Sequence, residues 1–387
     1  MTARDPIVIS SYARTPIGGF LGCLSGVKAT ELGAAAVREA VRRSGVDPER
    51  IDRIVMGCVL AAGLGQAPAR QAAIGAGLPT KVEATTINKM CGSGLQAAIL
   101  AADTIAAESA EVIVAGGMES MSNAPYLLAK HRSGARIGHD RMSDSMYLDG
   151  LEDAYEPGKL MGAFAEDAAR AYQLTRAAQD QFALESLTRA RAAQGSGGFD
   201  KEIVPVAGIA RDEQPERADP ARIPTLKSAF APDGTITAAN ASSISDGAAA
   251  VLMTRASTAK SLGLPVAARI VAHAAHAQEP RHFASAPVPA IHKVLAKAGW
   301  TVTDVDLFEV NEAFAAVAMI AMRELAIPHE RLNVNGGACA LGHPIGASGA
   351  RLLATLIAAL EARAAKRGVA ALCIGGGEAV AMAVECD

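Results

Sequence analysis

The sequence predicts an α/β protein made of two similar halves, each a mixed sheet covered by helices, with a long segment inserted into the first half. Three observations lead to this prediction. Half of the 387 residues are apolar but only 4% are aromatic, and Ala and Gly are abundant, which suits helices packed closely on a sheet. Sequence blocks recur in the same order in the two halves. Residues 120–240 differ from both halves and carry most of the tyrosines.

The first recurring block is a helix that ends in glycine, a short loop and a strand. It occupies residues 40–54 and returns about 254 residues later at 294–308. Glycine directly after the last helical residue is a common helix end. At nearly the same offset, the helix that follows residues 93–94 matches the helix that follows residues 348–349.

A third block is an apolar strand that runs into glycines and a glutamate. Residues 112–119 match residues 371–378, an alignment that places Cys373 over Val114. Because the three blocks keep one order and their offsets drift by only a few residues, we interpret them as two homologous halves.

These matches also predict the domain boundaries. We expect residues 1–119 and 241–265 to form the first half and residues 266–387 to form the second half. Residues 120–240 are expected to be an inserted loop domain with one clear helix, at residues 175–193. Large excursions of this kind usually cover an active site.

Charge and composition exclude several classes of partner. The net charge of −3 and the scattered Lys and Arg residues argue against a nucleic acid or a membrane surface. No apolar run reaches membrane-spanning length. Residues 1–6 hold no apolar signal core and residues 385–387 are not a peroxisomal tripeptide, so we expect a cytoplasmic protein. Its six cysteines are then expected to be thiols.

Cys91 is the first candidate nucleophile. It lies between a strand-like stretch, residues 84–87, and a helical run, residues 95–102. A sulfur at a helix N-terminus faces free N–H groups and the positive end of the helix dipole, both of which favour the thiolate. We therefore expect a pKa at least one unit below the usual value of about 8.5. The alternative is a buried cysteine at the start of a helix.

Three more segments carry polar or nucleophilic residues among glycines. Asn311 follows a strand, His343 stands between Gly342 and Pro344, and Cys373 ends an apolar strand. The duplication predicts that these segments and Cys91 converge where the halves meet. Each has a simpler alternative: a helix cap for Asn311, and a core position for His343 or Cys373.

Together these segments resemble the thiolase family, and most closely its short-chain acetyl-CoA acetyltransferases. The motifs are NKMCGSGLQA at 88–97, NEAF at 311–314, GGACALGHPIGASGAR at 336–351 and CIGGG at 373–377. The resemblance extends over residues 6–385. It implies the duplicated thiolase fold, with mixed sheets in an αβαβα layering.

The resemblance also implies a role for each candidate. Cys91 matches the nucleophile that becomes acylated, and His343 matches its base. Cys373 matches the acid/base that removes a proton from the second substrate. Asn311, through a water and together with the histidine, matches one oxyanion hole. The N–H groups of Cys91 and Gly375 match the other.

These roles belong to a reversible ping-pong Claisen condensation, in which two acetyl-CoA molecules give acetoacetyl-CoA and CoA. The enzyme thioester supplies a leaving group, and a thiolate base whose pKa its neighbours set forms the enolate. No cofactor or metal is implied beyond the coenzyme A thioesters.

Four alternatives stay open. One is a thiolase for longer or 2-methyl-branched 3-ketoacyl-CoA. A decarboxylating ketosynthase is disfavoured, because it requires a second histidine near Asn311 and no second catalytic cysteine. A non-catalytic acyl-CoA-binding relative would not need both cysteines. A zinc site of Cys339, His343 and Cys373 would consume the base of the nucleophile.

By resemblance, coenzyme A lies against the inserted segment. Ser242 is implied to hydrogen-bond the pantetheine, and the 3′-phosphoadenosine end is expected near Arg222 or Lys227. The implied channel is lined by Phe230, Leu151, Met161, Ala313 and Phe314, which have core packing as their alternative.

Several positions depart from the commonest family pattern. They are Leu160, Phe164, Ser243, Ser245, Phe283 and Ala379. Phe164 and Phe283 are larger than is usual, so we expect them to fill the acyl pocket and favour short chains, unless both belong to the core. The resemblance also implies a homotetramer, a dimer of dimers joined through the loop 121–145.

Overall fold

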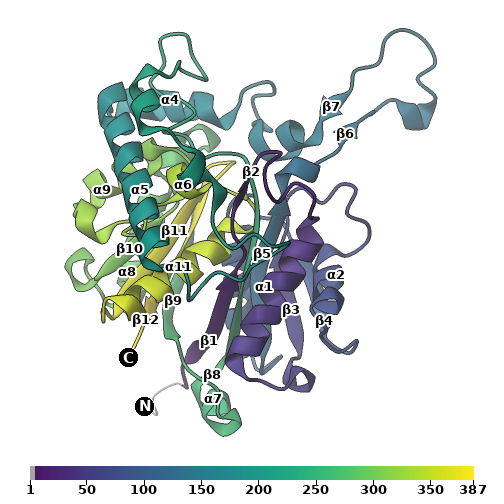
Figure 1. Cartoon of the computed structure of the whole chain (residues 1–387), viewed down its shortest axis with the longest axis vertical. Coiled ribbons are helices and arrows are strands. Elements are labelled where there is room, and N and C mark those ends of the chain that lie inside the picture. Colours follow the sequence, from purple (N-terminus) through teal and green to yellow (C-terminus); the bar gives the residue numbers. More distant parts are fainter. Residues whose placement is uncertain (1–4) are drawn as a thin grey trace.

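The computed structural model describes residues 5–387; residues 1–4, part of the stretch expected to lack a signal core, lie outside the described residues. A ten-stranded sheet runs through the molecule in the order β10-β11-β12-β9-β1-β8-β5-β3-β4, and β2 pairs with β8 beside this path (Figure 1). Helices cover both ends of the sheet.

The first half contains ten elements before the inserted segment or directly after it. They are β1 (Ile7–Arg14), β2 (Gly18–Gly19), α1 (Ala29–Ser44), η1 (Pro48–Arg50), β3 (Arg53–Gly57), α2 (Pro68–Gly75), β4 (Glu83–Ile87), α3 (Ser93–Ala106), β5 (Ile113–Ser120) and β8 (Ser245–Arg255), with α7 (Ala256–Leu262) leading out of the half.

The second half repeats much of this sequence of elements. They are β9 (Ala268–Ala277), η6 (Pro280–Ser285), α8 (Pro287–Ala298), η7 (Val302–Asp304), β10 (Leu307–Val310), α9 (Ala315–Leu325), η8 (His329–Arg331), α10 (Ala338–Leu341), α11 (Ser348–Ala362), β11 (Arg367–Ile374) and β12 (Glu378–Glu385).

The strand order confirms the predicted duplication. In the first half β3 is parallel to β4 and β5, and β8 pairs antiparallel with β5 and β1. In the second half β10 is parallel to β11, and β12 pairs antiparallel with β11 and β9. A single parallel bridge from Phe308 to Leu332 takes the place of β4. Both halves therefore have one topology.

Two aspartates fix the register of the duplication. The carboxylate of Asp52 accepts the backbone N–H groups of residues 111 and 112, and that of Asp306 accepts those of residues 366 and 367. Residue 112 is therefore equivalent to residue 367.

This register corrects the alignment expected for Cys373. Its structural equivalent is Met118, four residues after the Val114 expected from the glycine-rich blocks. The glycines misled that alignment because the two strands end differently. β5 runs on to Ser120, whereas β11 stops at Ile374 and turns at once into β12.

The two halves join at the centre of the sheet. Within the described residues, only the pairs Val8–Arg269 and Ile9–Ala268 connect β1 to β9. Hydrogen bonding therefore continues from one half to the other, and the two sheets expected from the sequence are the two ends of one sheet.

The helices form three layers around these ends. α3 and α11 pack against each other and against strands of both halves. α1 and α2 cover the outer face of the first half, and α8 and α9 cover that of the second. This arrangement is the αβαβα layering that the sequence predicts (Figure 1).

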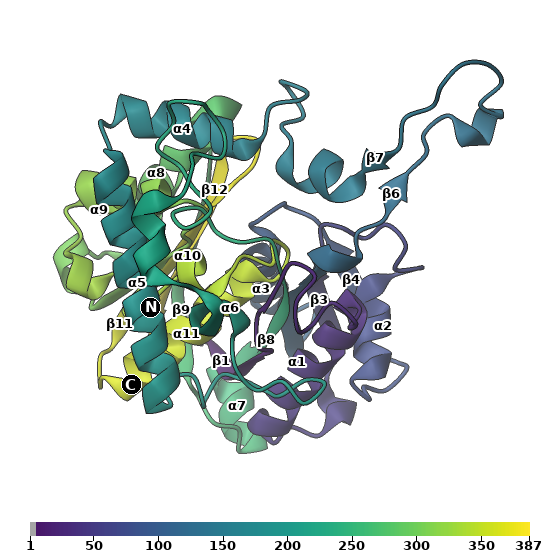
Figure 2. The same ribbon diagram turned by 45° about the horizontal axis from the view of Figure 1, so that its top comes forward.

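The inserted segment forms short elements and two longer helices. They are η2 (Met121–Asn123), β6 (Tyr126–Leu127), η3 (His131–Ser133), β7 (Ser143–Asp144), η4 (Tyr147–Leu151), α4 (Met161–Ala171), α5 (Arg176–Ser196), α6 (Glu213–Arg217) and η5 (Pro220–Thr225). The predicted helix at 175–193 is confirmed as α5, where the Thr175 hydroxyl accepts the N–H of Ala178. The hairpin of β6 and β7 projects away from the body (Figures 1 and 2).

No helix in the described part of the chain combines the length and the apolar character needed to cross a membrane.

Glycines let α3 and α11 touch at their N-termini. A Cβ atom on Gly94 would lie 2.7 Å from the backbone nitrogen of Ala350, and one on Gly349 would lie 2.2 Å from that of Leu95. Real Cβ atoms do not approach backbone this closely, so both positions need glycine. The contact also brings together the loops that precede the two helices.

This contact predicts a large effect of Gly349→Ala. The added methyl group must push α11 away from α3, at a cost of about 1–3 kcal/mol. We expect a lower midpoint of urea unfolding and lower activity, because both helices carry candidate catalytic loops.

Gly195→Ala is the matched control, since Gly195 lies in α5 with open space around it. Alanine should leave stability unchanged or raise it by about 0.5–1 kcal/mol. Equal unfolding midpoints for the two variants would show that the helix contact does not need glycine.

Candidate active site

The nucleophile candidate lies in a turn that its neighbours hold rigidly. Cys91 lies between β4 and α3, directly after Met90, whose φ of 46° is in the left-handed region. The Ser93 hydroxyl accepts the N–H of Lys89 at 2.8 Å and donates to the carbonyl of Met90 at 2.7 Å. These bonds offset the strain of a non-glycine residue at positive φ.

The pKa of Cys91 differs from the sequence expectation. Burial raises it to about 11, although the N–H groups of Gly375 and of Cys91 itself lower it. Desolvation therefore outweighs the helix N-terminus, and the expected low pKa is wrong for the free enzyme. The thiol holds its proton at neutral pH and needs a base.

The second cysteine lies close to the first. Cys373 is buried near the end of β11, and the chain then turns through Gly376 and Gly377, whose φ values are 92° and 85°. Burial raises the pKa of Cys373, and the neighbouring Cys91 raises it further. This mutual effect places the two sulfurs in one site.

An ion pair ties the two cysteine loops together. The ammonium group of Lys89 lies 2.8 Å from a carboxylate oxygen of Glu378, and both side chains are partly exposed. A Cβ atom on Gly92 would lie 2.4 Å from the Cδ1 atom of Ile374. The loop of one half therefore rests directly on the hairpin of the other.

Hydrogen bonds determine which nitrogen of His343 carries the proton. The Ser348 hydroxyl donates to the carbonyl of Pro344 at 2.9 Å, so its oxygen can only accept from the Nδ1 atom of His343, 2.5 Å away. Nδ1 is therefore protonated, and Nε2 keeps a free lone pair.

Asn311 faces that lone pair. Its amide nitrogen lies 3.4 Å from Nε2 of His343, and both residues are buried. The alternative role of Asn311 as a helix cap is excluded, because α9 begins at Ala315 with Phe314 as its N-cap.

The backbone of His343 is held by two of the departures from the family pattern. Its N–H donates to the carbonyl of Ser243 at 3.1 Å and to the hydroxyl of Ser245 at 3.3 Å. Burial, with a smaller effect of Arg351, lowers the pKa of His343 to about 3. The imidazole is therefore neutral in the free enzyme.

A buried glutamate of the first half supports the histidine loop. The carboxylate of Glu119 accepts the N–H groups of Val59 and Leu60 at 3.1 Å each and that of Gly346 at 2.8 Å. Burial raises the pKa of Glu119 to about 7. Because Gly346 belongs to the second half, Glu119 joins the halves beside the site.

The predicted pantetheine contacts surround the two cysteines. The Ser242 hydroxyl donates to the carbonyl of Ala313 at 2.9 Å, and its oxygen is left free to accept an amide N–H. Leu151 packs in one apolar cluster with Cys91. The remaining predicted channel residues pack in a cluster with Cys373; they are Phe230, Met161, Ala313 and Phe314.

The two unusual phenylalanines also belong to the Cys373 cluster. Phe164 and Phe283 are 1% and 2% exposed, so both are core residues as well as neighbours of the site. Phe283 contacts Phe314 edge-on, with 6.2 Å between ring centroids. Phe164 has the Lys159 ammonium 3.9 Å above its ring centroid.

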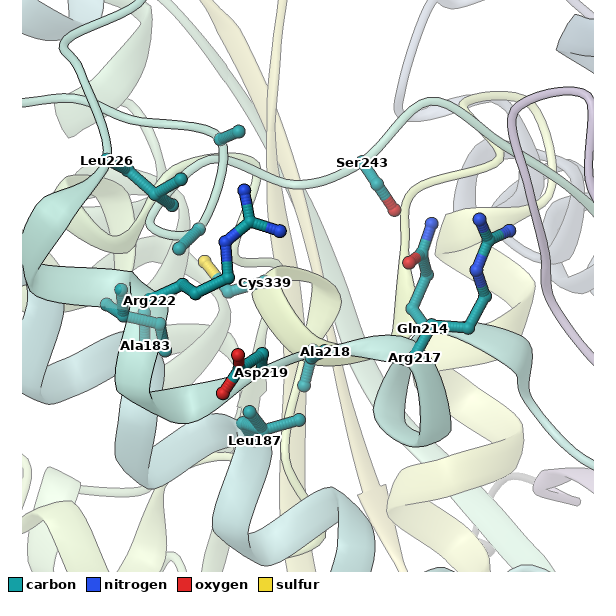
Figure 3. Close-up of a pocket in the computed structure, with 14 residues that line it drawn as sticks. Ala183, Leu187, Gln214, Arg217, Ala218, Asp219, Arg222, Leu226, Ser243 and Cys339 are labelled. Atoms are coloured by element: carbon teal, nitrogen blue, oxygen red, sulfur yellow. The ribbon is translucent and has the colours of Figure 1, made fainter.

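A cavity of about 280 Å³ lies on the other side of the histidine loop. Its lining comes from α5, from α6 and η5, and from the loops of Ser243 and Cys339 (Figure 3). Arg222 lines this cavity as predicted for a nucleotide-side residue, and Arg217 and Gln214 join it. Lys227 is exposed.

The proposed zinc ligands make other contacts. The Cys339 sulfur lies 3.6 and 3.7 Å from the carbonyls of Asn240 and Glu312, and His343 faces Ser348 and Asn311. Within residues 5–387, no group of three or more His, Cys, Asp or Glu residues is arranged to hold a metal ion.

Sequence reasoning missed the residues that hold His343 and Asn311. Ser348 was noted only as a landmark of the duplication, and Arg351 and Glu309 were not noted. A signal was present, because Arg351 is the one charge in the run ARLLATLIAAL and Glu309 the one charge in LFEV. Opposite charges in two otherwise apolar elements suggest a buried pair.

Known proteins resemble this chain over its whole length. The family models "Thiolase, N-terminal domain" and "Thiolase, C-terminal domain" match residues 7–257 and 264–386. An acetyl-CoA acetyltransferase of Cupriavidus necator is 49% identical over 98% of this chain and 99% of its own. A mouse protein named "Acetyl-CoA acetyltransferase, cytosolic" is 47% identical over 98% of both chains.

The fold has an equally extensive match. The crystal structure of the Bacillus anthracis acetyl-CoA acetyltransferase superimposes with a TM-score of 0.97 at 40% identity and covers 100% of both chains.

Proposed function

The chain belongs to the thiolase family, and on that premise we propose that it is an acetyl-CoA C-acetyltransferase that condenses two acetyl-CoA molecules into acetoacetyl-CoA and CoA, reversibly and through an acetylated Cys91. One observation carries the mechanism. Two cysteines, a neutral histidine and a buried amide converge where the halves meet.

The first half-reaction transfers an acetyl group to the enzyme. Nε2 of His343 takes the proton of Cys91, and the sulfur attacks the thioester carbonyl of acetyl-CoA. The N–H groups of Cys91 and Gly375 receive the oxyanion of the adduct. Its collapse breaks the bond from carbon to the CoA sulfur, and the CoA thiolate takes the proton back from the imidazolium.

The second half-reaction forms the carbon–carbon bond. The thiolate of Cys373 removes an α-proton from a second acetyl-CoA, whose enolate oxygen is stabilised by Asn311, through a water, and by His343. The α-carbon attacks the acetyl group on Cys91. The carbon–sulfur bond then breaks, and the Cys91 thiolate is reprotonated.

The surroundings of the cysteines support coenzyme A as the carrier. The free lone pairs of Ser242 suit a pantetheine amide, and the apolar cluster beside Cys373 suits an acyl chain. Arg222 and Arg217 at the nearby cavity suit the phosphates. A decarboxylating ketosynthase would have no use for Cys373.

The assembly proposed is a cytoplasmic homotetramer. The projecting loop 121–145 exposes Tyr126, Leu128, Met142 and Ile137, the last to 96%, and β4 leaves one edge of the sheet without a neighbouring strand in the described chain. Both features are typical of surfaces that a second copy covers. The mouse relative named cytosolic supports the location.

Light scattering tests the assembly. At micromolar concentration we expect a mass of roughly four chains of 39.6 kDa each. Ile137→Asp should reduce that mass to two chains, because a charge cannot be buried unpaired in an apolar contact. A wild-type mass of one chain would contradict the proposal.

Intact-mass measurement tests the acyl-enzyme. After mixing with acetoacetyl-CoA we expect one added acetyl group per chain, absent in Cys91→Ser, because Cys91 is the only proposed acyl carrier. Cys58→Ser is the control and should acetylate fully. Acetylation that persists in Cys91→Ser would remove Cys91 from the mechanism.

Hydrogen exchange tests the role of Cys373. In Cys373→Ala, deuterium exchange at C2 of acetyl-CoA should fall by at least about 100-fold, because general-base catalysis contributes about that much. Acetylation of Cys91 should continue. Exchange at the wild-type rate would instead assign the proton transfer to another group.

The phenylalanines predict a preference for short chains. Phe283 fills space next to Phe314, so acetoacetyl-CoA should be cleaved faster than six-carbon and longer substrates. Each methylene in such a pocket is worth about 1–3 kcal/mol. Phe283→Ala should flatten this gradient in kcat/KM across chain lengths. An unchanged gradient with lower stability would mean that the ring serves only the core.

A further inference from the structure

We infer that Arg351, held in place by Glu309, is a positioning residue that fixes the amide of Asn311 as a hydrogen-bond donor toward the reacting oxygen and His343. The inference deepens the proposed function and rests on it. Arg351 is 2% exposed and lies one turn after Ser348 on α11.

The guanidinium group decides which way the Asn311 amide points. Nη2 of Arg351 lies 3.5 Å from Oδ1 of Asn311. Because a guanidinium group only donates hydrogen bonds, the amide oxygen must face it and the amide nitrogen must face the histidine. A flipped amide would set N–H groups against a buried cation and a carbonyl oxygen against the lone pair of Nε2.

A second, independent bond gives the same proton arrangement. Ser348 fixes the proton of His343 on Nδ1, which leaves Nε2 as an acceptor for the Asn311 N–H. Residues 348 and 351 are three apart on a helix and share one face. One face of α11 thus holds the histidine through Ser348 and the asparagine through Arg351.

The partner of Arg351 is built into the same strand end as Asn311. Nη1 of Arg351 lies 3.4 Å from a carboxylate oxygen of Glu309, and both side chains are buried. Glu309 precedes Asn311 by two residues on an extended segment, so the two side chains point to the same side. The carboxylate compensates the charge of Arg351 and keeps it beside Asn311.

Arg351 also has no route to the substrate through the described contacts. Its two described side-chain partners are Glu309 and Asn311, so it acts through the amide. An oxyanion-hole donor is worth about 100- to 1000-fold in rate. A donor that is present but free to rotate should lose part of that factor, about 10- to 100-fold.

A double-mutant cycle between positions 351 and 311 tests the inference. The variants are Arg351→Met, Asn311→Ala and both together, with kcat expressed per active site titrated by acetylation of Cys91. That titration removes any loss caused by misfolded protein. Arg351→Met should lower kcat by about 10- to 100-fold and change KM little, but cost less than about threefold once Asn311 is alanine.

Two further variants guard against a failure to fold. Arg351→Met leaves Glu309 uncompensated, so the neutral pair Glu309→Gln with Arg351→Met replaces it in the same cycle if it does not fold. Arg351→Lys keeps the charge but lacks the two-pronged fork, and should recover only part of the activity. Arg189→Met, which removes bonds to the carbonyls of His329 and Leu332, should leave kcat per site unchanged.

The outcomes separate the inference from the proposed function. An equal cost of the Arg351 change with and without Asn311 would overturn the inference. Full activity of Asn311→Ala would instead overturn the proposed role of Asn311 itself. A loss that appears only when Asn311 is present, with Arg351→Lys between the extremes, is the expected result.

Discussion

The close approach of two helix N-termini is the constraint on which the site depends. α3 and α11 touch backbone to backbone because Gly94 and Gly349 have no side chains there. A loop that precedes a helix is carried by it, so this contact sets the distance between the Cys91 turn and the His343 loop. Hydrogen bonds between β1 and β9 are too few to fix that distance. The helix pair therefore aligns the two halves where chemistry takes place.

Burial then determines how the proton moves. Desolvation raises the pKa of Cys91 to about 11 and lowers that of His343 to about 3. Each separate charge is disfavoured, so the resting pair is neutral. Proton transfer creates a thiolate and an imidazolium together, and opposite charges in a low dielectric stabilise each other. The N–H groups that face the sulfur also stabilise the oxyanion. The ionised pair is thus formed with the substrate rather than kept in the empty site.

The sequence predicts the parts of this site that are chemically unusual and misses those that are geometrically determined. Cys91, His343, Asn311 and Cys373 stand out because reactive side chains among glycines are rare in an apolar chain, and the α/β layering follows from the repeated blocks. The register of Cys373 could not be predicted, because it depends on where β5 and β11 end. Nor could the pKa of Cys91, since burial is a property of the packed halves. Arg351 acts through a contact with Asn311, forty residues away.

The duplication explains why neither half suffices. In the first half, Met118 occupies the position equivalent to Cys373, and the next residue, Glu119, reaches across to hold Gly346 of the second half. In the second half, the same strand end carries Cys373 next to the nucleophile of the first half. Each strand end therefore serves the opposite half, one by supporting a loop and the other by supplying a reactive sulfur. Because β11 stops and turns at Gly376 and Gly377, Gly375 can present its N–H to Cys91. A strand that continued as β5 does would direct that N–H elsewhere. The difference in length between two homologous strands thus produces the asymmetry that two successive half-reactions require.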